Sequence, residues 1–175
     1  MPPAPSVAST ETTMNGVLQI LSDVAKAAAE HAAVLAGDAQ TTANNAVSAA
    51  ASANAKLSSW ASDSKISPTE KAALKQQKAD VVSEHTAFVQ EAGKYSISVT
   101  AFDAAYTAAI AAFDKYTAAS PEVITVESDY ANITAYYSSR TLIAQAVANA
   151  AKQAADAAQD AADDAAAAAE TANEA

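Results

Sequence analysis

Apolar side chains recur every three or four residues along most of this sequence, which is the pattern of amphipathic helices. The longest such pattern covers residues 14–60 and predicts one long alanine-rich helix. Its mean step is about 3.5 residues, the period of helices that supercoil around a neighbour. The seam of this helix is predicted at Met14, Val17, Leu21, Val24, Ala28, Ala32, Leu35, Ala39, Thr42, Ala46, Ala49, Ala53, Leu57 and Trp60.

Residues 61–147 carry nearly all of the bulky side chains and predict a compact domain of three helices. The first helix begins where Ser67 caps it, Pro68 takes the first helical position and Glu70 completes a capping box. It is predicted to end at Gly93, and the second and third helices follow. The predicted core contains Trp60, Leu74, Val81, Phe88, Phe102, Tyr106, Phe113, Tyr130, Ile133 and Tyr137.

The two ends of the chain have patterns of their own. Residues 1–13 contain Pro2, Pro3 and Pro5, which predict an extended arm that becomes ordered by docking on another protein. Residues 148–175 predict a helical tail rich in Ala and Asp. Its acidic last turns lack a cap and oppose the helix dipole, so either the helix frays or the sequence is part of a longer chain, and we favour the second. The predicted fold is all-α, with long alanine-rich, coiled-coil-like helices flanking a small three-helix bundle.

Composition indicates that these helices need a partner. Alanine makes up roughly 30% of the chain, and Leu, Ile, Val and Phe together make up only roughly 16%. Alanine favours the helix but buries little apolar area, since each methyl group removed from water contributes only about 0.8 kcal/mol. We therefore expect a homo-oligomer, a dimer or trimer. Its interface is predicted at Val17, Leu21, Val24, Leu35, Ala46 and Leu57.

Charge and residue types argue against several classes of function. The net charge of -10 at pH 7 disfavours binding to nucleic acids and to anionic membranes. No apolar run is long enough to predict membrane insertion. The chain has no Cys and only 2 His, and it contains neither a Gly-x-Ser-x-Gly turn nor a glycine-rich phosphate loop. We therefore expect no enzyme activity, no catalytic residue, no cofactor and no metal site.

Three further features have ordinary structural explanations. His85 lies on an apolar stripe, where a partly buried and hydrogen-bonded histidine is expected. Tyr136 and Tyr137, with Trp60, would offer a stacking surface for a sugar if they were exposed, but such aromatics are more often part of a core. The acidic residues that follow Asp156 lack the glycine turn of a calcium loop, so we expect a solvated helix face.

One combination of motifs resembles a known family. Residues 61–71 read Ala-Ser-Asp-Ser-Lys-Ile-Ser-Pro-Thr-Glu-Lys, and they are followed by Leu74-Lys75, by Phe102, Tyr106 and Tyr116, and by Tyr136-Tyr137-Ser138-Ser139-Arg140 with Leu142. Over residues 38–150 this order resembles the helical segment that recurs in tail-tip, tail-fibre and minor structural proteins of bacteriophages. In that family Ser-Asp-x-x-Leu-Thr-Pro-x-Glu-Lys-x-x-Leu-Lys precedes Tyr-Tyr-x-x-Arg. Where the family often has Glu-Trp, this chain has Gln77-Lys78, so a core aromatic is missing.

The resemblance implies a virion component of the tail or host-contact apparatus, made in the host cytoplasm and present in several copies. We expect a helical connector or fibre-base module that packs against its own copies and against other virion proteins. The family pattern supplies no catalytic residue. The alternative is an adhesin-like module that binds a host receptor through exposed aromatic side chains of the three-helix domain, and substitution of Tyr136 or Tyr137 separates the two hypotheses.

Overall fold

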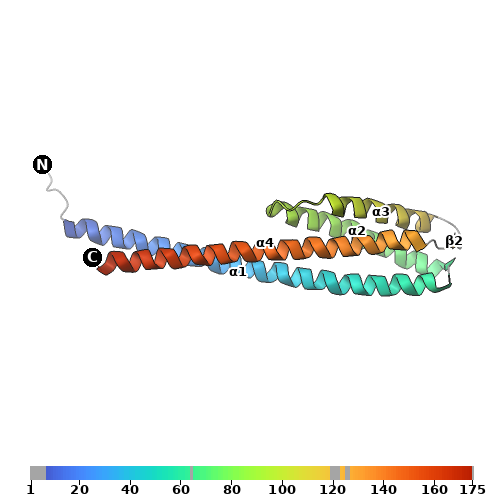
Figure 1. Cartoon of the computed structure of the whole chain (residues 1–175), viewed down its shortest axis with the longest axis horizontal. Coiled ribbons are helices and arrows are strands. Elements are labelled where there is room, and N and C mark those ends of the chain that lie inside the picture. Colours follow the sequence, from blue (N-terminus) through green and yellow to red (C-terminus); the bar gives the residue numbers. More distant parts are fainter. Residues whose placement is uncertain (1–6, 64, 119–122, 125–126, 175) are drawn as a thin grey trace. The chain divides into compact units, whose positions relative to one another are not determined.

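The chain folds almost entirely into helices. The computed structural model describes residues 7–63, 65–118, 123–124 and 127–174. These ranges contain the α-helices α1 (Val7–Trp60), α2 (Pro68–Lys94), α3 (Thr100–Ala118) and α4 (Glu127–Glu174), as Figure 1 shows. A 3-10 turn (Ala61–Asp63) and two short strands, β1 (Lys65–Ile66) and β2 (Val123–Ile124), lie between them. The expected all-α class is confirmed.

The start of α1 differs from the expectation. The helix begins at Val7, earlier than the predicted start at residue 14, so the end of the predicted extended arm is helical. The reason is that the segment after the N-terminal prolines contains no residue that interrupts helical hydrogen bonding. The prolines of the predicted docking arm, Pro2, Pro3 and Pro5, lie outside the described residues.

Local hydrogen bonds set both ends of α2. Ser67 Oγ accepts from the Glu70 N–H at 3.3 Å and Glu70 Oε2 accepts from the Ser67 N–H at 2.7 Å, which is the predicted capping box. At the other end the helix continues past Gly93 to Lys94. There Ser96 takes the left-handed conformation, with φ of 55°, and its N–H donates to the Gly93 carbonyl at 3.2 Å. The helix therefore ends later than predicted, because a serine instead of the glycine supplies the left-handed residue.

Removing the cap gives a direct test of this local account. Ser67→Ala is expected to lower the free energy of unfolding by about 1 kcal/mol, because the Glu70 N–H loses its acceptor. Urea unfolding followed by circular dichroism measures this change. Ser83→Ala, at an exposed position inside the same helix, is the control and is expected to change stability by less than about 0.5 kcal/mol. Equal losses in the two variants would show that the cap contributes nothing.

Contacts divide the chain into two compact units, and α1 and α4 contribute to both. The first unit comprises Met1–Asp38 and Ala150–Ala175, and the second comprises Ala39–Asn149. The second unit therefore contains the end of α1, all of α2 and α3, and the start of α4. It holds every Trp, Tyr and Phe of the sequence, whereas the helices of the first unit are rich in alanine.

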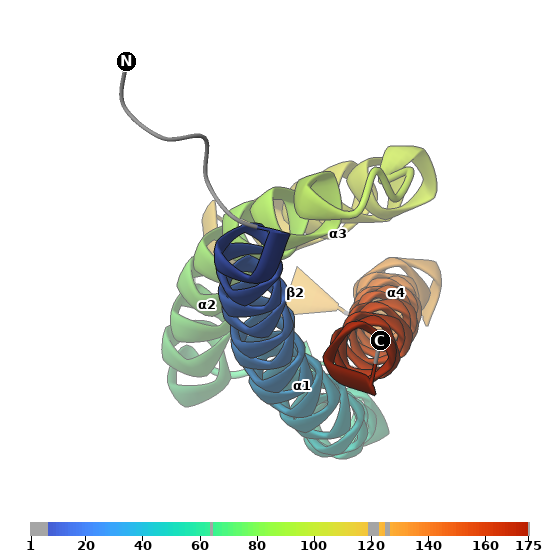
Figure 2. The ribbon, with the colours of Figure 1, turned by 90° about the vertical axis from the view of Figure 1, so that its left-hand side faces the viewer.

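The core of the second unit is aromatic and aliphatic. Helices α2 and α3 pack side by side, as Figure 2 shows. Strands β1 and β2 pair antiparallel, with Lys65 opposite Ile124. The rings of Phe102 and Tyr136 stack with centroids 5.4 Å apart. Among the predicted core residues, Trp60, Phe88 and Tyr106 are partly exposed, and the buried ones are Leu74, Val81, Phe102, Phe113, Tyr130, Ile133 and Tyr137.

The second unit also differs from the predicted three-helix domain of residues 61–147. The end of α1 packs in it as a further helix, and Ala43, Ala46 and Ala53 of α1 are buried there. The distance between packed helices depends on the size of the side chains at the contact, so alanines allow α1 a close approach. In this unit, the α1 alanines that we expected at a contact between chains pack against other helices of the same chain.

In the first unit α1 and α4 pack along a seam that consists mostly of alanine. The protected positions follow a seven-residue repeat on both helices, with alternating steps of three and four. They are Asn15, Leu18, Ser22, Ala25, Ala29, Ala32 and Ala36 on α1, and Ala151, Ala155, Ala158, Ala162, Ala165, Ala169 and Ala172 on α4. From Met14 to Ala28, each residue of the predicted α1 seam lies one position before a residue of the protected seam. The two seams are adjacent stripes of α1 with the same spacing.

Candidate functional site

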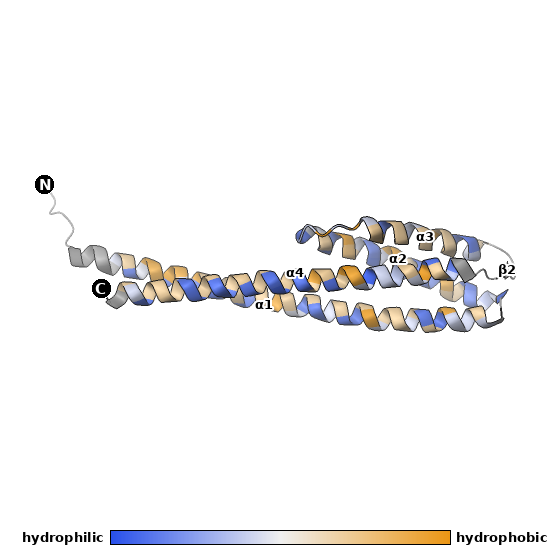
Figure 3. Ribbon diagram, viewed as in Figure 1, coloured by the Kyte–Doolittle hydropathy of each residue, from blue (hydrophilic) through white to orange (hydrophobic). Residues whose placement is uncertain are grey.

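A stripe of exposed apolar side chains runs along α1 in the first unit, where Figure 3 shows hydrophobic colouring on this helix. The α1 stripe, as we name it, keeps a seven-residue repeat and consists of one polar residue, His31, and of the apolar residues Met14, Val17, Leu21, Val24, Ala28 and Leu35. Its large apolar side chains are about half exposed or more: Met14 58%, Val17 52%, Leu21 55%, Val24 61% and Leu35 46%. Ile20 and Val34, beside the stripe, are also exposed.

Each member of the α1 stripe immediately precedes a member of the protected seam, so α1 carries two adjacent seams. The seam that packs on α4 holds mainly small side chains, and the larger ones lie on the α1 stripe. Burial of a Val, Leu, Ile or Met side chain contributes about 1.5–3 kcal/mol, and apolar surface of this kind marks sites of association. Residues 12–22 contain no charged side chain, so this part of α1 can meet a like-charged protein with little repulsion.

The structure separates the predicted interface residues into two groups. Those on the α1 stripe are Val17, Leu21, Val24 and Leu35. The side chains of Ala46 and Leu57 are buried inside the second unit, at 4% and 2% exposure, so neither offers a surface to another chain. After Ala28 the predicted seam alternates between the two sides of α1: Leu35 and Thr42 are exposed, whereas Ala32, Ala39 and Ala46 are protected.

Arg140 is the largest fully buried side chain in the described part of the second unit, with an exposure of 1%. From α4 its Nη1 donates to Glu84 Oε2 on α2, and its Nη2 donates to the Ala46 carbonyl on α1 at 3.1 Å. The guanidinium also lies over the Tyr137 ring, 4.9 Å from its centroid. Sequence reasoning did not place Arg140 in the core. The available signal was the Tyr-Tyr-x-x-Arg spacing, which puts the arginine one helical turn from both tyrosines.

Tyr136 and Tyr137 are buried, at 0% and 5% exposure, and both are hydrogen bonded. The Tyr136 hydroxyl donates to the Val81 carbonyl at 3.2 Å, and Gln77 Nε2 donates to the Tyr137 hydroxyl at 2.8 Å. Burial raises the pKa of both hydroxyls above the usual value for tyrosine. These two side chains therefore belong to the core and do not form the exposed aromatic surface that the receptor-binding alternative needs.

The raised pKa values predict a loss of stability at alkaline pH. Above pH about 10 the unfolded chain releases the protons of Tyr136 and Tyr137 before the folded chain does, so the free energy of unfolding is unaffected below that pH and falls above it. The slope contributed by Tyr136 is expected to approach about 1.4 kcal/mol per pH unit, and Tyr137 adds to it in the same direction. Urea unfolding at a series of pH values measures this slope, and Tyr136→Phe is expected to reduce it by the contribution of Tyr136. An unchanged slope in this variant would contradict the assignment.

The described residues show little other chemistry. His85 Nε2 lies 2.9 Å from Asp103 Oδ1, and the His85 ring stacks on Tyr106 with centroids 3.8 Å apart, so this histidine is a partnered member of the helix packing. No group of three or more His, Asp or Glu side chains within the described ranges is placed to hold a metal ion. In the same part of the chain, no helix has both the length and the apolar character that crossing a membrane requires.

Comparison of the chain with protein-family models, with curated proteins and with solved structures finds no significant match. The assignment of a function therefore depends on the α1 stripe, on the resemblance of the motifs and on the chemistry of the described residues.

Proposed function

We propose that this chain is a structural protein of a bacteriophage particle, a helical connector or fibre-base module of the tail or host-contact apparatus, and that it works by associating with its own copies. The observation that carries the proposal is the α1 stripe, a seven-residue repeat of large apolar side chains that remain exposed in the folded chain. Two or three copies of α1 bury these side chains against one another in a coiled coil.

The occupant of the stripe is a second copy of this chain. A seven-residue repeat matches another helix with the same repeat, and the stripe of a second copy provides it. Each copy carries a net charge of -10, and a contact region that is free of charge reduces the repulsion between two copies. Residues 12–22 supply such a region. The alanine-seamed helices of the first unit then act as coiled-coil-like spacers, which suits a connector that holds other virion proteins at a fixed spacing.

The location in a phage particle is supported by the resemblance of residues 38–150 to tail-tip, tail-fibre and minor structural proteins. Mass spectrometry of purified particles of a phage that encodes the chain tests it. We expect the chain in the particles at several copies each. Its presence in the host lysate together with its absence from purified particles would contradict the proposal.

A further inference from the structure

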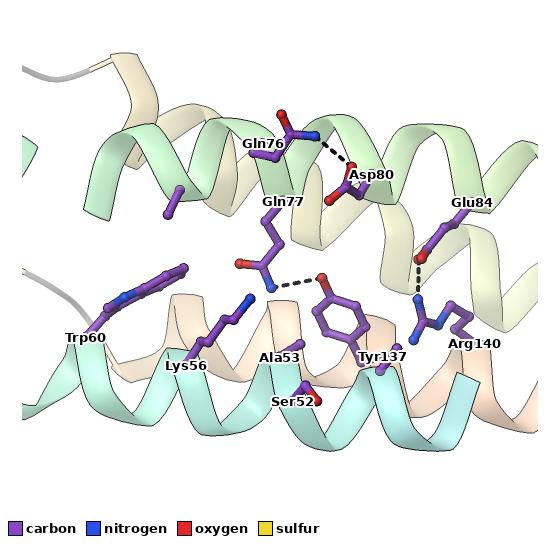
Figure 4. Close-up of a pocket in the computed structure, with 12 residues that line it drawn as sticks. Ser52, Ala53, Lys56, Trp60, Gln76, Gln77, Asp80, Glu84, Tyr137 and Arg140 are labelled. Carbon is purple, nitrogen blue, oxygen red and sulfur yellow. Dashed lines mark hydrogen bonds and ion pairs between the residues drawn. The ribbon is translucent and has the colours of Figure 1, made fainter. Parts of the chain in front are cut away.

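A polar cleft opens between α1 and α2 in the second unit, with α4 behind it (Figure 4). Its volume is about 520 Å³, within the range of small-molecule sites in proteins. Trp60 and Lys56 enter it from α1, Gln77 and Asp80 from α2, and Arg140 from α4. The cleft thus combines one aromatic ring with convergent polar groups from three helices.

Two buried polar atoms at this cleft have no hydrogen-bond partner among the described residues: the Oε1 of Gln77 and the Nε of Arg140. Figure 4 shows the Gln77 amide between α1 and α2, with its nitrogen directed to Tyr137 and its oxygen turned toward the Trp60 side. A buried acceptor or donor without a partner costs free energy, and such atoms in a folded protein commonly meet a ligand or a water molecule. The cleft therefore has hydrogen-bonding capacity that the chain itself does not use.

The charges of the cleft select a neutral ligand. The positive charges of Lys56 and Arg140 balance the negative charges of Asp80 and Glu84, so the lining has no net charge. An anion would be repelled by Asp80 and Glu84, and a cation by Lys56 and Arg140. In either case the lining has no excess of the opposite charge to offset this repulsion. The lining offers donors from Lys56 and acceptors from Gln77 and Asp80, so a suitable ligand must both donate and accept. Hydroxyl groups do both.

We propose that the cleft binds a neutral saccharide unit. One face of the sugar ring packs its C–H groups on Trp60, and its hydroxyls bond to Asp80, Gln77 and Lys56. Trp60 is exposed in part, so the ring is accessible from solvent. The cleft lies in the second unit and the α1 stripe lies in the first, so the sugar site and the self-association site are separate features. Either proposal can fail without the other.

Titration of the full chain with neutral sugars tests this site. The probes are the methyl glycosides of glucose, galactose, mannose and N-acetylglucosamine, followed by oligosaccharides of the same sugars, so that binding of a single unit is distinguished from binding of a glycan end. Trp60 is the single tryptophan of the sequence, so tryptophan fluorescence reports on the cleft. Calorimetry measures the affinity independently. We expect saturable binding with a dissociation constant of about 1 mM or below for at least one probe.

Three variants complete the test. Trp60→Ala, followed by calorimetry, and Asp80→Asn are each expected to weaken binding about tenfold, the effect of one lost contact of about 1.4 kcal/mol. Asp163→Asn is the matched control, because Asp163 accepts from Gln159 across one helical turn as Asp80 does from Gln76, but belongs to the first unit. Asp80 is exposed on α2, so Asp80→Asn carries the test if Trp60→Ala does not fold.

Three results would overturn the proposal. The first is the absence of saturable binding for every neutral probe up to roughly ten times the expected dissociation constant. The second is binding that the Asp80→Asn variant leaves as strong as in the unaltered chain. The third is a clear preference for glucosamine or sialic acid over all of the neutral sugars, since the cleft would then select charge.

Discussion

Replacement of Arg140 by alanine is expected to lower the free energy of unfolding by about 3 kcal/mol. The variant removes a side chain that is 1% exposed, together with its bonds to Glu84 on α2 and to the Ala46 carbonyl on α1. The cavity that it leaves adds to the loss. The Glu84 side chain is 37% exposed and stays partly solvated, which keeps the expected loss at the low end of the range for a broken buried ion pair.

Chemical unfolding followed by circular dichroism measures the effect of Arg140→Ala. The matched control is Lys152→Ala, which removes an exposed ion pair with Asp156 and is expected to change stability by less than about 0.5 kcal/mol. Arg140→Lys keeps the positive charge but loses the planar group that bonds two helices at once, so we expect an intermediate loss. A stability of Arg140→Ala equal to that of Lys152→Ala would show that Arg140 does not join the helices of the second unit.

The double variant Leu21→Lys with Val24→Lys is expected to weaken self-association at least about 100-fold, which corresponds to about 2.7 kcal/mol. Each substitution replaces an exposed apolar side chain of the α1 stripe with a charge that an apolar interface cannot bury without a partner. Both side chains are more than half exposed and lie off the protected seam, so the helix content of the chain is expected to stay unchanged. Sedimentation velocity measures the association and circular dichroism measures the helix content.

Leu142→Lys is the matched control for this double variant. Leu142 is 66% exposed on α4 and belongs to the second unit, so it resembles Leu21 in type and exposure but lies off the α1 stripe. We expect this variant to associate as the unaltered chain does. If Leu142→Lys weakened association as strongly as the double variant, the α1 stripe would not be the specific interface.

The parts of the fold that depend on local bonds could be predicted from the sequence. The capping box of α2 is formed by Ser67 and Glu70, which are neighbours across one helical turn, so their arrangement follows from the sequence alone. The helical class follows similarly from the alanine content and from the apolar spacing. Part of the aromatic core could also be predicted, because Phe102, Phe113 and Tyr137 carry large side chains that favour burial.

The choice between the two stripes of α1 could not be predicted from the pattern. Leu21 and Ser22 lie on adjacent stripes with the same repeat, and hydrophobicity alone favours Leu21 as the buried residue. The structure protects Ser22, because α4 brings an alanine seam to α1 and small side chains on both helices permit a close approach. Which face meets α4 is decided by residues more than a hundred positions away in the chain, and periodicity within α1 carries no information about them.

The Tyr-Tyr-x-x-Arg spacing places Arg140 near the two tyrosines, but its burial and the cleft between α1 and α2 could not be predicted from the sequence, because both depend on contacts between helices. The burial of Arg140 depends on Glu84 and on the backbone of Ala46, which come from two other helices. The cleft depends on Trp60 and Gln77 facing one space from different helices. We expected Trp60 in the core, but it ends α1 and keeps part of its surface exposed.

Sedimentation equilibrium of the unaltered chain over a wide range of concentrations tests the central claim most directly, because it measures the mass of the particle without assuming its shape. We expect the mass of two or three 17.6 kDa chains, with dissociation toward the single chain on dilution. A mass of one chain at every concentration, with the helix content of the folded protein retained, would contradict it.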